Sequence, residues 1–218
     1  MRYYKRAAFG REVALLGGLL VIGLAQVNAA NLISNPGFEA DPIPAGLPGA
    51  MFGAGNSLTS WDVAAGQNIS LYNAGSGVPA INSQSLMFTA VGAQGVSQNV
   101  TAGLYPAGTQ YTLSWSAGNF AEGIDYNYKV QVTGDVPAGT EWTFLGEMGG
   151  TGTILPDFKS VNFTSTGNSS IKVNFIRLTG AGNFVVIDDV SLVPEPQTYA
   201  LFAGLGLIAF AGYRRFRS

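Results

Sequence analysis

The chain has 218 residues, of which 47% are hydrophobic and only 11% are charged, and its formal net charge is −2. It contains no Cys and no His, which excludes disulfides, thiolate or imidazole zinc sites, haem attachment and Ser-His-Asp or Cys-His nucleophile pairs. Any metal would be a hard cation held by oxygen atoms, such as Ca²⁺ or Mg²⁺. Residues 31–193 carry 4 Lys and Arg against 11 Asp and Glu, so this acidic segment lacks a basic stripe and we expect no nucleic-acid partner.

The N-terminal segment has the pattern of a secretory signal. Residues 1–11 are basic, residues 13–25 form an apolar run, and small residues follow up to Ala29 and Ala30. This order predicts a signal peptide over residues 1–29, cleaved after Ala29 or Ala30. The alternative is an uncleaved membrane anchor, but a helix of this apolar length spans only about 20 Å of a ~30 Å hydrocarbon core.

Short segments of the body alternate apolar and polar side chains with a period of two, which is typical of half-buried strands. Gly, Pro, Asn and Ser separate these segments, and none has sustained helical spacing. The spacing predicts an all-β fold of about nine or ten strands, an antiparallel β-sandwich or barrel. The predicted strands are 69–72, 85–90, 95–100, 111–116, 126–133, 141–145, 161–164, 171–175 and 184–192.

The stretch 40–56 is rich in Pro and Gly and is expected to be irregular, because these residues interrupt a ladder. A loop of this length is either functional or a surface crossover between two sheets.

The two ends of the body carry recognisable motifs. It opens with N-L-I-S-N-P-G-F-E at residues 31–39 and closes with I-D-D-V-S-L at 187–192, with Trp61 and the strand 111–115 between them. These motifs resemble the galactose-binding-like jelly rolls, which include several carbohydrate-binding modules. The resemblance covers residues 31–193 and implies a jelly-roll sandwich whose first and last strands are neighbours.

The same resemblance implies a structural Ca²⁺ held by Glu39 and Asp188, together with backbone carbonyls near residues 35–38. Successive residues of a strand face opposite sides, so only one of Asp188 and Asp189 can point into such a site, and the motif favours Asp188. The alternative is that both acids end a solvated sheet edge and keep it from pairing with another chain.

A sugar site in this fold needs exposed aromatic rings beside amides or carboxylates. The candidate ligand-binding residues are Trp142, Tyr72, Phe120, Asp125 and Tyr126. The alternative for each ring is packing in the core, where we expect Trp61 and Trp115.

The C-terminal residues 194–218 have three parts in a fixed order. Pro194-Glu195-Pro196 is followed by an apolar run over residues 199–212 and then by the basic residues Arg214, Arg215 and Arg217. This tail resembles the PEP-CTERM sorting signal of Gram-negative bacteria, which implies that an exosortase in the inner membrane recognises the Pro-Glu-Pro element and cuts near it. The alternative is an ordinary tail anchor, for which the apolar run is short.

Together these features predict an exported protein that passes through an inner-membrane intermediate and ends at the cell surface or in the extracellular matrix. We expect a non-catalytic body that contacts exopolysaccharide and has no catalytic residues. The alternatives are a structural or adhesive protein without a ligand pocket, and a carboxylate-dependent glycoside hydrolase or lyase.

Overall fold

The computed structural model describes most of the body of the chain and a few residues of its C-terminal tail. The described residues are 30–43, 47, 49–53, 58–64, 67–73, 82–88, 94–100, 107–119, 126–146, 157–167, 170–178, 185–195, 204, 208 and 212–213.

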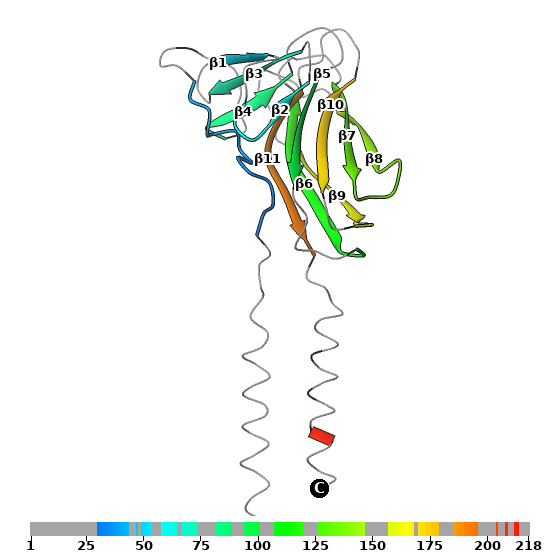
Figure 1. The fold of residues 1–218 in the computed structure, drawn as a ribbon. Helices are drawn as coiled ribbons and strands as arrows, with labels where there is room; N and C mark the ends of the chain where they lie inside the picture. The colour runs from blue at the N-terminus through cyan, green and yellow to red at the C-terminus, as the bar shows by residue number, and fades with distance from the viewer. Residues whose placement is uncertain are drawn as a thin grey trace, which may run out of the picture.

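Two antiparallel sheets form the body (Figure 1), which confirms the predicted all-β sandwich. The six-stranded sheet has the order β1 (Gly49–Gly53), β3 (Asn68–Asn73), β4 (Gln84–Met87), β11 (Val185–Pro194), β6 (Gln110–Asn119) and β9 (Asp157–Thr164). The five-stranded sheet has the order β2 (Asp62–Val63), β5 (Gln94–Val100), β10 (Ile171–Arg177), β7 (Tyr126–Gly134) and β8 (Glu141–Gly146).

All nine predicted strands are present, but the stretch 40–56 is not irregular throughout. Residues 49–53 form β1, which pairs with β3 at the edge of the six-stranded sheet. A Cβ on Gly49 would lie 2.5 Å from the carbonyl oxygen of Leu71, so glycine is what lets the two backbones approach. The glycine that argued against a strand here is therefore what allows one.

The core lies between the two sheets and is built on aromatic side chains. The ring centroid of Phe175 lies 5.6 Å from that of Trp115 and 6.2 Å from that of Trp61. Trp115 Nε1 donates a hydrogen bond of 2.9 Å to Tyr128 Oη, which satisfies the indole N–H in the interior. Both Trp61 and Trp115 are buried, which confirms the expectation from strand alternation for Trp115 and from the jelly-roll resemblance for Trp61.

The first described segment pairs with the last strand of the body (Figure 1). Leu32 N donates to Leu192 O at 2.9 Å, and Val190 N donates to Pro36 O at 3.0 Å. The segment thus lies beside β11 below the short strand β4, which contacts only the start of β11. Both ends of the body therefore leave it side by side.

The two predicted hydrophobic segments fall mainly on residues that the structure does not describe. Residues 1–29 lie outside the described ranges, and after Glu195 only residues 204, 208 and 212–213 are described, all as helix. Nowhere in the described ranges does a helix reach the length and apolar character needed to cross a membrane.

Candidate functional site

An acidic corner forms where the N-terminal segment meets β11, and it contains the two predicted metal ligands. A Cβ on Gly37 would lie 3.5 Å from Asp188 Oδ1 and 3.6 Å from Glu39 Cγ, so both side chains border the same small space over this glycine. Asp188 is fully buried, whereas Glu39 is exposed. Asp189 is also exposed, so the structure places only Asp188 of the pair in the corner.

The loop that carries Glu39 is held in a sharply turned conformation. Asn35 and Phe38 have φ values of 50° and 59°, in the left-handed region that few non-glycine residues adopt. Phe38 is fully buried and its ring lies 5.2 Å from Trp61. Burial of this ring offsets the cost of the turn, which is of order 1–3 kcal/mol per such residue.

Gln84, at the start of β4, joins this loop to the six-stranded sheet. Its backbone N–H donates to Glu39 Oε1 at 2.8 Å, and its side-chain Nε2 donates to the carbonyl oxygens of Phe38 and, at 3.0 Å, Asp41. Asp41 is buried and accepts hydrogen bonds from Thr59 N and Thr59 Oγ1, the latter at 2.7 Å. The corner is therefore assembled from three parts of the chain that are distant in sequence.

Burial raises the pKa of Asp188 to about 7, and the nearby charges of Asp189 and Glu39 act in the same direction. Two hydrogen bonds oppose the rise: Asp189 N donates to Asp188 Oδ1 at 2.8 Å, and Ser85 Oγ donates to Asp188 Oδ2 at 3.1 Å. A negative charge at this position therefore lacks solvent and lies next to other negative charges.

The donor set of the corner fits a Ca²⁺ ion in chemistry but is sparse in carboxylates. Within the described ranges, the ion pairs join Lys129 to Glu141 and Lys159 to Asp157, and neither contacts the corner. No cluster of three or more His, Cys, Asp or Glu side chains suited to a metal occurs there either. Glu39 and Asp188 would hold the ion together with backbone carbonyls of the loop, which are oxygen ligands that Ca²⁺ accepts.

The alternative that both acids end a solvated edge is wrong. β11 lies between β4 and β6 in the interior of the six-stranded sheet, and Asp188 is fully buried there. A side chain in this position cannot protect an edge, because β11 has a neighbour on each side.

A second candidate site is a row of polar side chains across the outer face of the five-stranded sheet, here called the polar row. Its members stand opposite one another on neighbouring strands: Asp62, Ser97, Asn174, Gln131 and Glu141. Glu141 accepts hydrogen bonds from Lys129 Nζ at 3.0 Å and from Gln131 Nε2 at 3.1 Å. At ~4.8 Å between strands, five members extend over about 19 Å.

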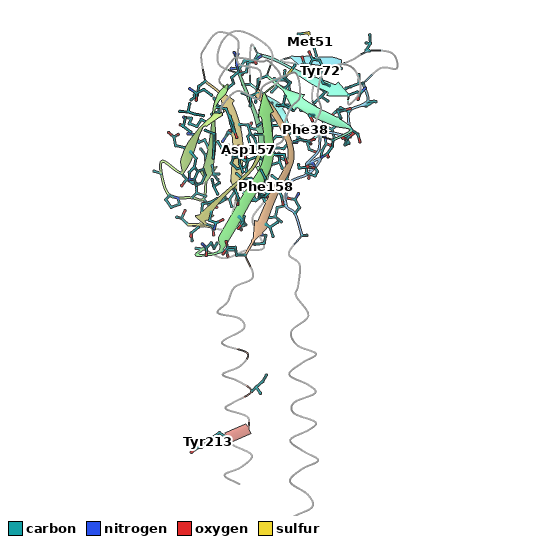
Figure 2. The ribbon with its side chains drawn as sticks, turned by 180° about the vertical axis from the view of Figure 1, so that it is seen from behind. Phe38, Met51, Tyr72, Asp157, Phe158 and Tyr213 are labelled. Atoms are coloured by element: carbon teal, nitrogen blue, oxygen red, sulfur yellow. The ribbon has the colours of Figure 1, made fainter. Side chains whose placement is uncertain are left out.

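Of the predicted ligand-binding residues, the two whose side chains are described, Trp142 and Tyr72, lie apart on different sheets. Trp142 is partly buried on the inner face of β8, 6.5 Å from Phe163. Tyr72 lies on the other sheet, on the outer face near the exposed side chain of Met51 (Figure 2). Phe120 and Asp125 lie outside the described residues, as does the side chain of Tyr126, whose backbone opens β7. Their role in ligand binding stays a prediction.

The start of the predicted sorting motif is part of the sheet. Pro194 is the last residue of β11 and is buried opposite Tyr111, and Glu195 follows it. Pro196, Arg214, Arg215 and Arg217 lie outside the described residues.

Sequence reasoning missed the polar residues that build these sites, namely Gln84, Ser85, Asp41, Gln131 and Asn174. The only available signal for Gln131 and Asn174 was the outward position in alternating strands. Nothing in one sequence links Gln84 or Ser85 to Asp188, because their contact depends on which strands become neighbours.

Comparison with solved structures supports the fold. A cyclase from Fischerella sp. TAU has a TM-score of 0.56 at 17% identity, covering 77% of this chain and 98% of that one. A cyclase from Fischerella sp. TAU in complex with 4-(1H-indol-3-yl)butan-2-one has a TM-score of 0.53 at 19% identity, covering 77% of this chain and 98% of that one. The tandem CBM22-1-CBM22-2 domain of Paenibacillus barcinonensis Xyn10C gives 0.50 at 15% identity, covering 78% of this chain and 46% of that one. At these identities the likeness shows the shared jelly-roll fold.

The search of curated proteins found no match. A family model described as "HpiC1-like: HpiC1 cyclase" matches residues 29–193, which is the whole β-sandwich. The prediction that the chain is not an enzyme is therefore wrong, because the family takes its description from a cyclase and the match spans residues 29–193. The chain belongs to the HpiC1-like family.

Proposed function

We propose that this chain is an exported member of the HpiC1-like family that engages an extracellular polysaccharide and is released by cleavage at its Pro-Glu-Pro element. The single observation that carries the ligand proposal is the polar row, which places amide, hydroxyl and carboxylate groups in line across one sheet face. Catalysis, which family membership supports, would take place on the same ligand.

The pairing of the first segment with β11 supports the export proposal. Because Leu32 contacts Leu192 directly, both tails leave the body at one end. The predicted signal segment and the predicted C-terminal helix can then enter one membrane while the body stays on one side of it. An exosortase would act on the chain in this inner-membrane intermediate and release the body to the cell surface or matrix.

The chemistry of the polar row supports a sugar ligand. Sugar hydroxyls both donate and accept hydrogen bonds, and the amides of Asn174 and Gln131 offer both functions side by side. Asn174 Nδ2 donates to the Gln131 backbone oxygen at 3.1 Å, which fixes the Asn174 side chain on the outer face. The shared fold of carbohydrate-binding modules supports the same ligand class.

Alanine at Asn174 should weaken binding of the host's exopolysaccharide by about tenfold, because each lost polar contact is worth ~1 kcal/mol or slightly more. Affinity electrophoresis or calorimetry measures the loss, and mass spectrometry of the incubated polysaccharide detects turnover. The matched control is Ser160→Ala, which removes a hydroxyl from the outer face of the other sheet. Equal affinity of Asn174→Ala and the unchanged protein would rule out the polar row as the binding site.

We also propose that Ca²⁺ binds at Glu39 and Asp188. Asp188 is buried beside the negative charges of Glu39 and Asp189, and this supports a cation there. The ion would neutralise the carboxylates of the corner and link the N-terminal loop to β11. This role is structural and lies on the six-stranded sheet, separate from the polar row.

A further inference from the structure

The first two residues of the Pro-Glu-Pro element are held by strand β6. Glu195 N donates a 2.8 Å hydrogen bond to Gln110 O, and Thr112 Oγ1 donates a 2.9 Å hydrogen bond to Glu195 Oε1. Pro194 is buried opposite Tyr111. We call the two hydrogen bonds of Glu195 the Glu195 latch.

The position of Glu195 follows from strand geometry. Val193 stands opposite Thr112 on the outer face of the six-stranded sheet, and alternation returns Glu195 to the same face two residues later. Thr112 also stands opposite Asn162, whose Oδ1 lies 3.1 Å from the Thr112 hydroxyl. The hydroxyl has one proton, so it can donate only one hydrogen bond, here to Glu195. It can accept a second one from the Asn162 amide if the oxygen and nitrogen of that amide exchange places.

The latch is the last point at which β11 can pair with β6. Pro196 has no backbone N–H, so the ladder cannot continue through it. A peptidase that reads the motif must take this segment into its own cleft as an extended chain, and Glu195 cannot occupy that cleft and bind β6 at the same time. Cleavage breaks one peptide bond, with water supplying OH to the new carboxyl group and H to the new amine.

We propose that the Glu195 latch controls processing: the Pro-Glu-Pro element is cut only when Glu195 has left β6, and Thr112 sets how often this occurs. The inference rests on the proposed processing of the tail. A hydrogen bond from a hydroxyl to a half-exposed carboxylate changes the closed-to-open ratio by about three- to tenfold. Loss of the Thr112 hydroxyl therefore raises the open fraction, and the rate of tail removal, by that factor.

Pulse–chase labelling of the full chain in an exosortase-bearing Gram-negative host tests the latch, with mass spectrometry identifying the new C-terminus. Thr112→Val should lose the tail about three to ten times faster than the unchanged chain, since valine keeps the shape and suits a strand. Thr112→Ser retains the hydroxyl and should match the unchanged rate. Ser114→Ala is the matched control, because it removes a hydroxyl from the same face of β6 two residues away from Thr112.

Hydrogen exchange of the full chain gives a readout that does not depend on the peptidase. The Glu195 amide should be protected in the unchanged chain and in Ser114→Ala, and should exchange faster in Thr112→Val. If Thr112→Val is processed at the unchanged rate, or more slowly, the latch proposal is overturned while processing itself stands. If the unchanged chain never loses its tail, the processing proposal fails and the latch role fails with it.

Discussion

Asp188 is an ionisable side chain in surroundings that do not favour a charge. It is a carboxyl group on an interior strand, fully buried, with its nearest charged neighbours of the same sign. A protonated acid or a bound cation resolves this conflict, and the two solutions respond differently to pH and to chelators.

In the metal-free protein, Asp188 should make the free energy of unfolding fall as the pH rises from about 4 to about 7. Its pKa is about 7 in the folded chain against an ordinary value of 3.8 for an aspartate, so within this window the folded state holds a proton that the unfolded state has lost. The stabilising contribution is fully present below about pH 4 and is lost through pH 7, with an upper bound of ~4 kcal/mol. Urea titrations at several pH values, with chelator present, measure this slope.

Asp188→Asn should abolish that slope, because the amide does not titrate. Asp62→Asn removes an exposed carboxylate from β2 and should leave the slope in place. A free energy of unfolding that rises between pH 4 and 7 in the unchanged protein would contradict the assignment of a raised pKa to Asp188.

At the scale of elements, Gln98 of β5 connects the N-terminal segment to the five-stranded sheet. Its Oε1 accepts from Ser34 N at 2.8 Å, and its Nε2 donates to Ser34 O at 2.8 Å and to Ser60 O at 2.9 Å. The segment is thus bonded to both sheets, since it also pairs with β11.

Gln98→Ala should lower the free energy of unfolding by about 1–3 kcal/mol, because it removes the partner of two backbone groups of Ser34 in the segment and of the Ser60 carbonyl oxygen. Asn99→Ala, at the exposed neighbouring position of the same strand, should change it by less than about 0.5 kcal/mol. Chemical denaturation measures both. Similar losses in the two variants would show that the Gln98 bonds do not hold the segment.

The strands were predictable because most of them bury a single face, so that apolar and polar residues alternate along their sequence. In β10, every second residue from Ile171 to Arg177 is buried, and the apolar residues Ile171, Val173 and Phe175 display this period in the sequence. The sequence did not predict β1, because Gly49 reads as a strand breaker although it allows the close approach of β1 and β3. It did not predict β2, because a strand of two residues is too short to show an alternating pattern. The pairing of β4 with β11, which brings Ser85 to Asp188, joins residues 103 positions apart and has no local signal.

For the molecule as a whole, Ca²⁺ at the corner should raise the melting temperature, and a chelator should reverse the rise. At a concentration 100 times its dissociation constant, the ion adds about 2.7 kcal/mol to the free energy of unfolding. Gly37→Ala should remove most of this response, because the added methyl group enters the space bordered by both carboxyl side chains. Calorimetric melts with and without Ca²⁺ measure the difference.

Gly95→Ala places the same methyl group on β5, 3.4 Å from the Phe175 carbonyl oxygen, and should keep the full Ca²⁺ response. A melting temperature that chelator leaves unchanged would end the calcium proposal, while the polar row and the Glu195 latch would be unaffected.

The place of β11 in the middle of the six-stranded sheet has a consequence for when the body can fold. Until residues 185–194 are available, the sheet consists of two separate parts, β1-β3-β4 and β6-β9, and the N-terminal segment has no strand to join. Folding therefore cannot be completed from the N-terminus during synthesis, since the last strand closes the structure. A chain that stays open until its final strand arrives is suited to being threaded through a translocation channel before it folds on the far side.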